Sequence, residues 1–465
     1  MKLAEESVDS YIHVGKLNNI KDVQQICQIL KNKPNLEILI FSMNQLDDDG
    51  IKLLCDPIRS FISLKKLIVR NNHFGDAGMK FLCDTLKENT SLTEIDLCKN
   101  RFRKEGVRDL SELLRVNKTL KKINLEGNFL KTEKLESLCF ALKINLTVEK
   151  LDLSNNEIKE DSLDLIADCL MTNKSIKSLN LSFNCINDLN LLSKVLRINN
   201  TLTSINLSCN FLENNFENLA KSLKNNSALI KLNLSNNRLK NQDLKCLASV
   251  FKTNCTLQNV NLFLTNINDE EILFISKSIK TNTSIRTLNL SQNNFTSKGF
   301  KHFCDSLKHN SSLKIAYFSN NYIDRKGVKY LSEALENNNS LTEIDFPTLI
   351  DVDNESFERF KNSLIQNSSL RKIVHSFKDD NVHSQQIDYL LKSNIEWHPS
   401  NHGEYSLGFQ EFTFAFLLVL NHFKTKFLIE IPKFIKFEIM KRIDRKSFIP
   451  DFKEDEEICL FLEGF

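Results

Sequence analysis

The stretch Leu120-Lys-Lys-Ile123-Asn-Leu125-Glu-Gly-Asn128-Phe-Leu130 has the form L-x-x-L-x-L-x-x-N-x-L, and the chain repeats it along most of its length. Strings of this form recur every 26 to 28 residues, which is too regular for chance. They begin at Leu36, Leu64, Leu92, Leu120, Val148, Ile176, Leu202, Leu229, Leu257, Ile285, Leu313 and Leu341, with a degenerate copy at Leu370. A fixed period of this length indicates a solenoid of stacked supersecondary units.

Each repeat predicts one strand followed by one helix. Alternating apolar residues such as Leu151 and Leu153 place two side chains on one face of a short strand. Val107, Leu110 and Leu114 then recur at helical spacing. One column of the predicted helices is always small, which lets each helix lie close to the sheet: Cys55, Cys83, Ser111, Cys139, Ala167, Ser193, Ala220, Ala248, Ser276, Cys304 and Ser332. We therefore interpret these cysteines as packing residues.

Two asparagine columns are predicted to be structural. The first follows each strand, where an inward amide can bond to the backbone of neighbouring turns: Asn44, Asn72, Asn100, Asn128, Asn156, Asn184, Asn210, Asn237, Asn293 and Asn321. The second ends the helices, where we expect asparagine because it tolerates the left-handed conformation: Asn89, Asn117, Asn145, Asn173, Asn282 and Asn310. The second column matches the glycosylation sequon. Because the N-terminus has no apolar signal core, we expect no glycosylation, reduced thiols and a cytoplasmic location.

The repeat resembles the ribonuclease-inhibitor-like class of leucine-rich repeats. That class includes ribonuclease inhibitor, the Ran GTPase-activating protein and the arrays of NOD-like receptors. The resemblance covers residues 36–374, which hold 12 to 13 units. It implies an α/β solenoid, a right-handed horseshoe with parallel strands on the concave face and helices on the convex face. It implies little about the ligand, because one fold can carry many functions.

The remaining segments predict caps and a small second module. Residues 1–35 are expected to form an N-terminal helical cap, with an amphipathic helix from Asp22 to Leu30. Residues 375–405 are expected to form a cap and linker. Residues 406–465 are expected to form a small C-terminal helical module rich in Phe. Within it, residues 431–443 resemble the opening of an F-box, with Pro432 starting a helix and Ile435, Ile439 and Ile443 on one stripe. A helical cap that closes the end of the solenoid is the alternative reading of this module.

The composition gives no reason to expect a nucleic-acid or membrane partner. The 62 basic and 59 acidic residues nearly balance, and no apolar run reaches the length of a membrane span. The chain contains no phosphate-binding loop, no nucleophile elbow and no metalloprotease motif. His398 and His402 have a spacing found in zinc sites, but Pro399 disfavours a regular helix between them. We therefore expect no enzyme activity, no catalytic residues, no metal and no cofactor.

Departures from the repeat predict the partner-binding site. The third, fifth, seventh and eighth positions of each unit are expected to face the concave side, where Asn and Ser dominate the middle of the array. Phe263 and Leu264 replace a polar pair there, and Ile315 and Tyr317 lie two units further on. An apolar cluster among polar residues is typical of a recognition patch, although local repacking around Thr265, which replaces a column asparagine, would also explain it. A second apolar group, Ile38, Ile40 and Ile68, is expected either to bind a partner or to lie under the N-terminal cap.

These features predict a non-enzymatic scaffold that binds a protein partner on its concave surface. One alternative is a substrate receptor of a ubiquitin ligase, in which the F-box-like segment would dock a cullin adaptor. A second alternative is a GTPase activator resembling the Ran regulator. Its usual long acidic tail is reduced here to residues 454–457, which weakens that resemblance.

Overall fold

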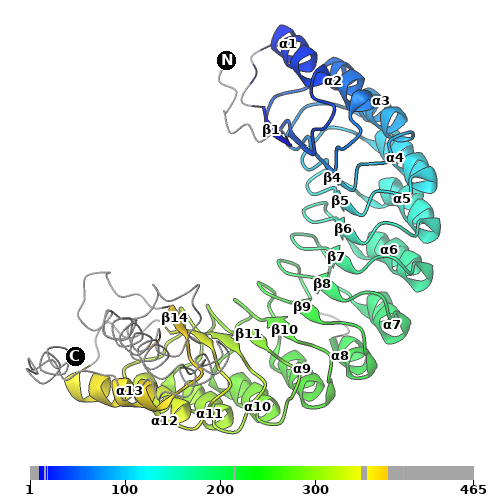
Figure 1. Cartoon of the computed structure of the whole chain (residues 1–465). Coiled ribbons are helices and arrows are strands. Elements are labelled where there is room, and N and C mark those ends of the chain that lie inside the picture. The colour runs from blue at the N-terminus through cyan, green and yellow to red at the C-terminus, as the bar shows by residue number, and fades with distance from the viewer. Residues whose placement is uncertain are drawn as a thin grey trace, which may run out of the picture.

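One curved parallel sheet runs through the whole array (Figure 1). The computed structural model describes residues 10–14, 17, 19–212, 216–346, 353–374 and 391. Within these residues fourteen strands pair in strict sequence order. They are β1 (Tyr11–His13), β2 (Ile38–Ile40), β3 (Lys66–Ile68), β4 (Glu94–Asp96), β5 (Lys122–Asn124), β6 (Lys150–Asp152), β7 (Ser178–Asn180), β8 (Ser204–Asn206), β9 (Lys231–Asn233), β10 (Asn259–Asn261), β11 (Thr287–Asn289), β12 (Ile315–Tyr317), β13 (Glu343–Asp345) and β14 (Lys372–Val374).

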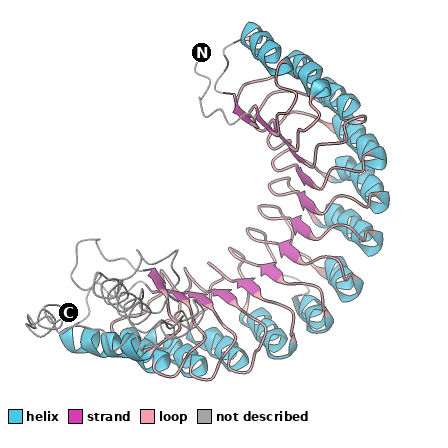
Figure 2. Ribbon diagram, in the orientation of Figure 1, coloured by secondary structure: helices cyan, strands magenta, loops and turns pink. Residues whose placement is uncertain are grey.

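A helix follows each strand from β1 to β13 and lies on the outer side of the arc (Figure 2). The helices are α1 (Ile20–Lys31), α2 (Asp48–Ser60), α3 (Asp76–Leu86), α4 (Lys104–Val116), α5 (Thr132–Ile144), α6 (Glu160–Thr172), α7 (Asn190–Ile198), α8 (Phe216–Asn225), α9 (Asn241–Thr253), α10 (Asp269–Ile279), α11 (Ser297–Leu307), α12 (Lys326–Leu335) and α13 (Asn354–Gln366). Strands are short and helices are longer and bulkier, so the sheet curves with its free face inward. The predicted leucine-rich repeat solenoid is confirmed.

The array begins earlier than the repeat pattern indicates. The predicted N-terminal helix is present as α1, whose first turn is capped by Asn19 accepting from the backbone N–H of Lys21 at 2.9 Å. Strand β1 was not predicted, yet it pairs with β2 in the register of the rest of the sheet. Residues 10–31 thus add one more strand and helix to the stack. Ile38 and Ile40 are half-buried and pair with Tyr11 and His13 of this strand, while Ile68, also half-buried, lies one strand further on in β3.

The asparagines that follow the strands form a ladder between repeats, as predicted. Asn128 shows the pattern, since its Nδ2 donates to the carbonyl of Leu97 in the preceding repeat at 3.1 Å. Its own backbone N–H donates to Oδ1 of Asn156 in the next repeat at 2.8 Å. Asn156 is fully buried, so these bonds form in a protected setting where an unmet polar group would be costly. Asn128 therefore joins its turn to both neighbours.

The reason predicted for the second asparagine column is wrong. Asn117, Asn145 and Asn173 have extended backbones, with φ between −74° and −62°. Asparagine is needed here for its side chain: Oδ1 of Asn145 accepts from the N–H of Val148 at 2.9 Å, and its Nδ2 donates to the carbonyl of Leu114 at 2.8 Å. A buried Nδ2 that is already bonded is a poor acceptor for a glycan.

The small column lies where the helices meet the sheet. Every member of the column is buried, and Ala220 in α8 and Ser332 in α12 are 3% and 0% exposed. The eleven cysteines that the structure describes are free thiols. Burial raises the pKa of Cys27 to about 11 and of Cys169 to about 12, which keeps these thiols protonated at neutral pH. The four cysteines of the small column, Cys55, Cys83, Cys139 and Cys304, are buried in the apolar core, as predicted.

Candidate functional site

The concave face is built from the first and third residue of each strand. In β6, Leu151 is buried in the core, while Lys150 and Asp152 on either side of it point to the inner surface. The pattern repeats in every strand because successive side chains of a strand alternate between faces. Since the register between neighbouring strands never shifts, equivalent residues form straight columns across the sheet.

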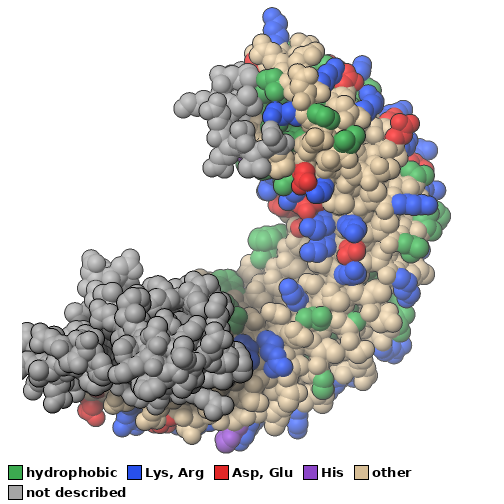
Figure 3. Space-filling model, viewed as in Figure 1, with side chains coloured by type: hydrophobic (Ala, Val, Ile, Leu, Met, Phe, Trp, Pro, Cys, Tyr) green, Lys and Arg blue, Asp and Glu red, His purple; other side chains and the backbone are tan. Residues whose placement is uncertain are grey.

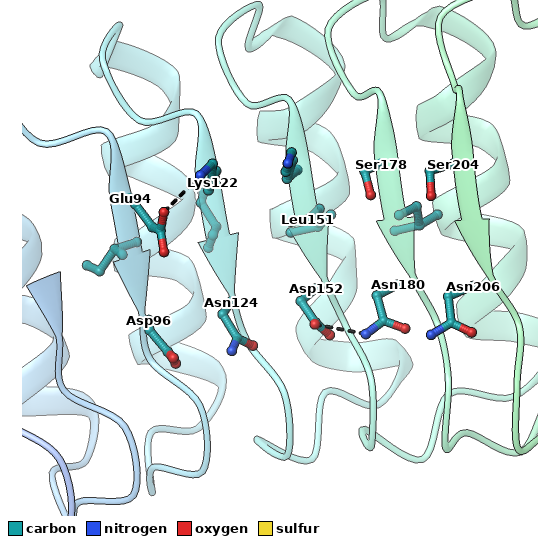
Figure 4. Close-up of a pocket in the computed structure, with 14 residues that line it drawn as sticks. Glu94, Asp96, Lys122, Asn124, Leu151, Asp152, Ser178, Asn180, Ser204 and Asn206 are labelled. Atoms are coloured by element: carbon teal, nitrogen blue, oxygen red, sulfur yellow. Dashed lines mark hydrogen bonds and ion pairs between the residues drawn. The ribbon is translucent and has the colours of Figure 1, made fainter. Parts of the chain in front are cut away.

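Charged residues gather on the N-terminal half of this face and line a shallow hollow of about 400 Å³ (Figure 4). Glu94 lies between Lys66 and Lys122 and pairs with the Lys122 ammonium at 3.0 Å. Figure 3 shows acidic and basic side chains next to one another on this part of the inner surface. The hollow is lined by Glu94, Ile95, Asp96, Lys122, Ile123, Asn124, Lys150, Leu151, Asp152, Ser178, Leu179, Asn180, Ser204 and Asn206.

The two carboxylates at the start of the hollow have opposite pKa shifts. Partial burial opposes ionisation of Glu94, but hydrogen bonds from Lys66 and Lys122 outweigh it and lower the pKa of Glu94. Burial dominates at Asp96 and raises its pKa, although the N–H of Cys98 donates to it at 3.0 Å. Two cations already neutralise Glu94, so this end of the face is a mixed-charge surface without a strong field of one sign.

Amides replace the charges in the middle of the array. Asn206, Asn233, Asn261 and Asn289 occupy the last position of β8, β9, β10 and β11 and are paired in register. Each Oδ1 accepts from the backbone N–H two residues later, at 3.0 Å in all four cases. These bonds fix the side chains in one orientation. The predicted Asn and Ser surface is therefore an ordered array of amides.

Phe263 and Leu264 lie in the loop that leaves β10. Phe263 is half-buried, and its backbone N–H donates to Oδ1 of Asn261. Leu264 is 43% exposed and has a left-handed backbone, with φ of 53°. Thr265 is fully buried and its Oγ1 donates to the carbonyl of Leu262 at 2.8 Å, so it partly replaces the missing ladder asparagine.

Ile315 and Tyr317 are the first and last residues of β12, and both are half-buried. Tyr317 is aligned with Asn289 of β11, and its hydroxyl donates to Glu343 at 3.3 Å. Burial and the Glu343 charge both raise the pKa of Tyr317. One strand, β11, separates Ile315 and Tyr317 from the loop that carries Phe263 and Leu264.

A set of exposed apolar side chains along the loops was not predicted. Phe129, Phe183 and Phe211 are 61%, 62% and 61% exposed, and each follows a strand, at the eighth or tenth position of its repeat. Phe129 and Phe183 also have left-handed backbones, with φ of 53° and 54°. Met43 and Tyr322 continue the set at the two ends of the array. Reading the eighth and tenth positions as columns in the sequence would have identified them.

The described part of the chain contains neither a metal-binding cluster nor a membrane-spanning helix. Among those residues no group of three or more His, Cys, Asp and Glu side chains could hold a metal ion. None of the described helices combines the length and the apolar character that crossing a membrane requires. His398, His402, the F-box-like residues 431–443 and the segments 375–405 and 406–465, apart from Leu391, fall outside the described residues.

Comparisons with known proteins find one family model and several similar solved structures. A family model described as "Leucine Rich repeat" matches residues 32–55, 62–83, 172–189 and 281–304. Among solved structures, the chain is similar to an internalin from Listeria monocytogenes, at 16% identity over 77% of this chain and 95% of that one, with a TM-score of 0.47. It is also similar to a structure of the Rad7 and Elc1 complex in yeast, at 14% identity over 72% and 86% of the two chains, with a TM-score of 0.44.

A third similar structure is actin-binding site 2 of leiomodin-1, at 22% identity over 28% of this chain and 74% of that one, with a TM-score of 0.26. A search of curated protein sequences finds no match. Leucine-rich repeat sequences are thus recognised at four places along the array, and the fold is one parallel sheet backed by helices. Those four segments are therefore similar to leucine-rich repeats, and the described residues have the fold of a leucine-rich repeat solenoid.

Proposed function

We propose that this chain is a non-enzymatic scaffold that binds a protein partner on its concave face, around Phe263, Leu264, Ile315 and Tyr317. The 28-residue spacing supports placing its repeats in the ribonuclease-inhibitor-like class. The partner contacts the amide columns of β8 to β11 and inserts an apolar group between the two flanking pairs of apolar residues. A cytoplasmic location belongs to the same proposal.

The observation that carries the proposal is the exposure of Leu264. Leu264 is unfavourable in the free protein for two reasons. Its apolar side chain is 43% exposed to water, and its backbone is in the left-handed region, which leucine rarely adopts. Asparagine, which tolerates the left-handed conformation better, holds the same position one turn earlier at Asn236 and two turns later at Asn320. A partner that covers Leu264 and Phe263 would gain the hydrophobic contribution that the free protein lacks.

The test compares two variants of the full chain. Phe263→Ser with Tyr317→Ser removes both aromatic rings from the proposed site, and each loss is expected to weaken binding by about 2 kcal/mol, typical of a hot spot. Phe140→Ser removes an equally large ring from α5 on the outer side, where Phe140 is 54% exposed. Partners captured by the wild-type chain would be purified, and their affinities for each variant measured by biolayer interferometry.

We expect the concave variant to lose affinity and the Phe140→Ser variant to keep it. Equal affinity of the concave variant, with an unchanged circular dichroism spectrum, would place the binding site elsewhere. The ubiquitin-ligase alternative is tested separately, because it requires residues 431–443 and recovery of a cullin adaptor. The GTPase-activator alternative requires stimulated GTP hydrolysis in a panel of small GTPases.

A further inference from the structure

The four aligned amides of β8 to β11 all present the same atom to solvent. Each Oδ1 receives a backbone N–H, at 3.0 Å. A backbone N–H can only donate, so the atom that faces it must be the oxygen of the amide. The Nδ2 group of Asn206, Asn233, Asn261 and Asn289 is therefore the end left for a ligand. This assignment follows from the hydrogen bonds and not from the similar shapes of the two amide atoms.

These donors have no acceptor among the residues that the structure describes. The contrast is Asn180 on β7, whose Nδ2 donates to Asp152 at 2.8 Å (Figure 4). From β8 onward no acidic side chain stands beside the column until β13, since the first strand positions there hold Ser204, Lys231, Asn259, Thr287 and Ile315. The result is a row of four amide donors at strand spacing, about 4.8 Å apart and about 14 Å long.

One free positive charge accompanies the donors. Lys231 is exposed on β9, two residues before Asn233 on the same face of the strand, and forms no ion pair with any described residue. Donors with a single cation and no nearby acid suit carboxylates, which accept hydrogen bonds and carry one negative charge each. A doubly charged phosphate group is usually bound by arginine clusters, and the inner positions of β8 to β11 hold no arginine.

We propose that β8 to β11 bind an extended acidic segment of a protein partner through its side-chain carboxylates. The lengths agree, because alternate residues of an extended chain lie about 6.8 Å apart on one side, so three such carboxylates span about 14 Å. This inference rests on the proposed concave binding function and specifies the chemistry of the partner there. The amides hold the acidic side chains, and the apolar residues around Phe263 hold a neighbouring apolar group.

The chain itself supplies the substitution that tests the idea. Asp96 and Asp152 occupy the same strand position as the amides and still accept the backbone N–H two residues later, at 3.0 and 2.9 Å. Asparagine to aspartate therefore keeps the structural bond and replaces the outward donor with an acceptor. Gln242→Glu together with Asn218→Asp is the matched control, because it makes the same charge change on the outer helices α9 and α8.

The probe is a fluorescein-labelled octapeptide of alternating Glu and Ser, and the readout is fluorescence anisotropy in 50 mM salt with the full chain. We expect saturable binding that Asn233→Asp with Asn261→Asp weakens about tenfold or more, while the outer-helix control stays within about twofold. Lys231→Gln should also weaken binding. If the double variant is unfolded by circular dichroism, the single variant Asn261→Asp replaces it.

Three results would each overturn the inference. The first is equal binding of the Gln-Ser octapeptide, which offers acceptors without charge. The second is a double variant that folds and keeps its affinity for the Glu-Ser peptide. The third is markedly tighter binding of a phosphoserine peptide. Each can occur while the Phe263 and Tyr317 variant still loses the captured partner, so failure here is distinguishable from failure of the proposed function.

Discussion

The backbone N–H of Thr265 donates to Oδ1 of Asn293 at 3.0 Å, but Thr265 offers no matching acceptor to the repeat before it. In several other repeats the residue two after the ladder asparagine donates to the next ladder asparagine, as Leu130 does to Asn156 at 3.2 Å. The corresponding N–H of Leu239 bonds instead within its own loop, to the carbonyl of Asn237 at 3.0 Å. The ladder is thus interrupted on one side of Thr265.

Thr265→Asn should complete the ladder and stabilise the protein. The two side chains have similar volumes, and Thr265 is fully buried, so the new amide would lie where its neighbours lie. It would donate to the carbonyl of Leu234 and accept from the N–H groups of Asn237 and Leu239. The expected gain is about 1–2 kcal/mol in the free energy of unfolding, measured by urea denaturation.

The reverse exchange, Asn293→Thr, is the control for this prediction. It removes the Nδ2 bond to Leu262 at 2.8 Å and the acceptor used by Thr265 and Ile267, so we expect a loss of stability. If Thr265→Asn left the urea midpoint unchanged or lowered it, the interruption would not be a defect of the free protein.

Ala220→Phe should destabilise the array. Ala220 is 3% exposed on α8 and belongs to the small column that faces the sheet. A phenyl ring there must push the helix outward or strain its neighbours, at a cost of about 1–3 kcal/mol or more. An unchanged thermal melting curve would show that the column has room that the packing does not indicate.

Asn145→Ala and Asn145→Asp should separate the two roles of the helix-end asparagine. Alanine removes the acceptor for Thr147 and Val148 and the donor to Leu114, and leaves buried backbone groups unmet. We expect it to cost about 2–3 kcal/mol in urea denaturation. Aspartate retains the acceptor but loses the donor and brings a charge close to the Leu114 carbonyl. A stability equal to wild type for the alanine variant would contradict the structural role of this column.

Alkaline pH should weaken the fold through its buried thiols. Burial raises the pKa of Cys169 from 9.0 to about 12, so the folded state keeps a proton that the unfolded state releases. The stability that this thiol contributes is therefore fully present below about pH 9 and is lost as the pH rises toward 12. The loss reaches about 2 kcal/mol by pH 10.5. Urea midpoints of wild type and Cys169→Ala should converge between pH 8.5 and 10.5. Parallel curves would contradict the shift.

The fold was predictable because the signal recurs. Apolar residues at strand and helix spacing, small residues such as Ala220 and the ladder asparagines repeat in nearly every unit, so errors in one unit are corrected by the others. Strand β1 was not predicted because Tyr11-Ile12-His13 lacks the leucines of the repeat motif. It pairs with β2 through backbone hydrogen bonds, which do not depend on the side chains. The helix-end column was found but misread, since the sequence pattern does not distinguish a backbone role for Asn145 from a side-chain role.

The candidate site was predictable only in part. The departures at Phe263 and Tyr317 are visible as breaks in a column, but the direction in which Asn233 points its Nδ2 depends on a hydrogen bond to Ser235. Periodicity carries no information about that bond. Phe183 holds the same eighth position as Leu264, but it follows Ser182, so no apolar pair marks it in the sequence.

The left-handed backbone of the exposed aromatic residues has a cost in the free protein. Phe183 combines a φ of 54° with 62% exposure, while Asn155 and Asn236 fill the same position with a residue suited to that backbone. Asparagine or glycine in place of Phe183 would be favoured by backbone preference and by solvation together, so in the free protein the ring is kept against both. Only a contact that covers the ring would offset that cost.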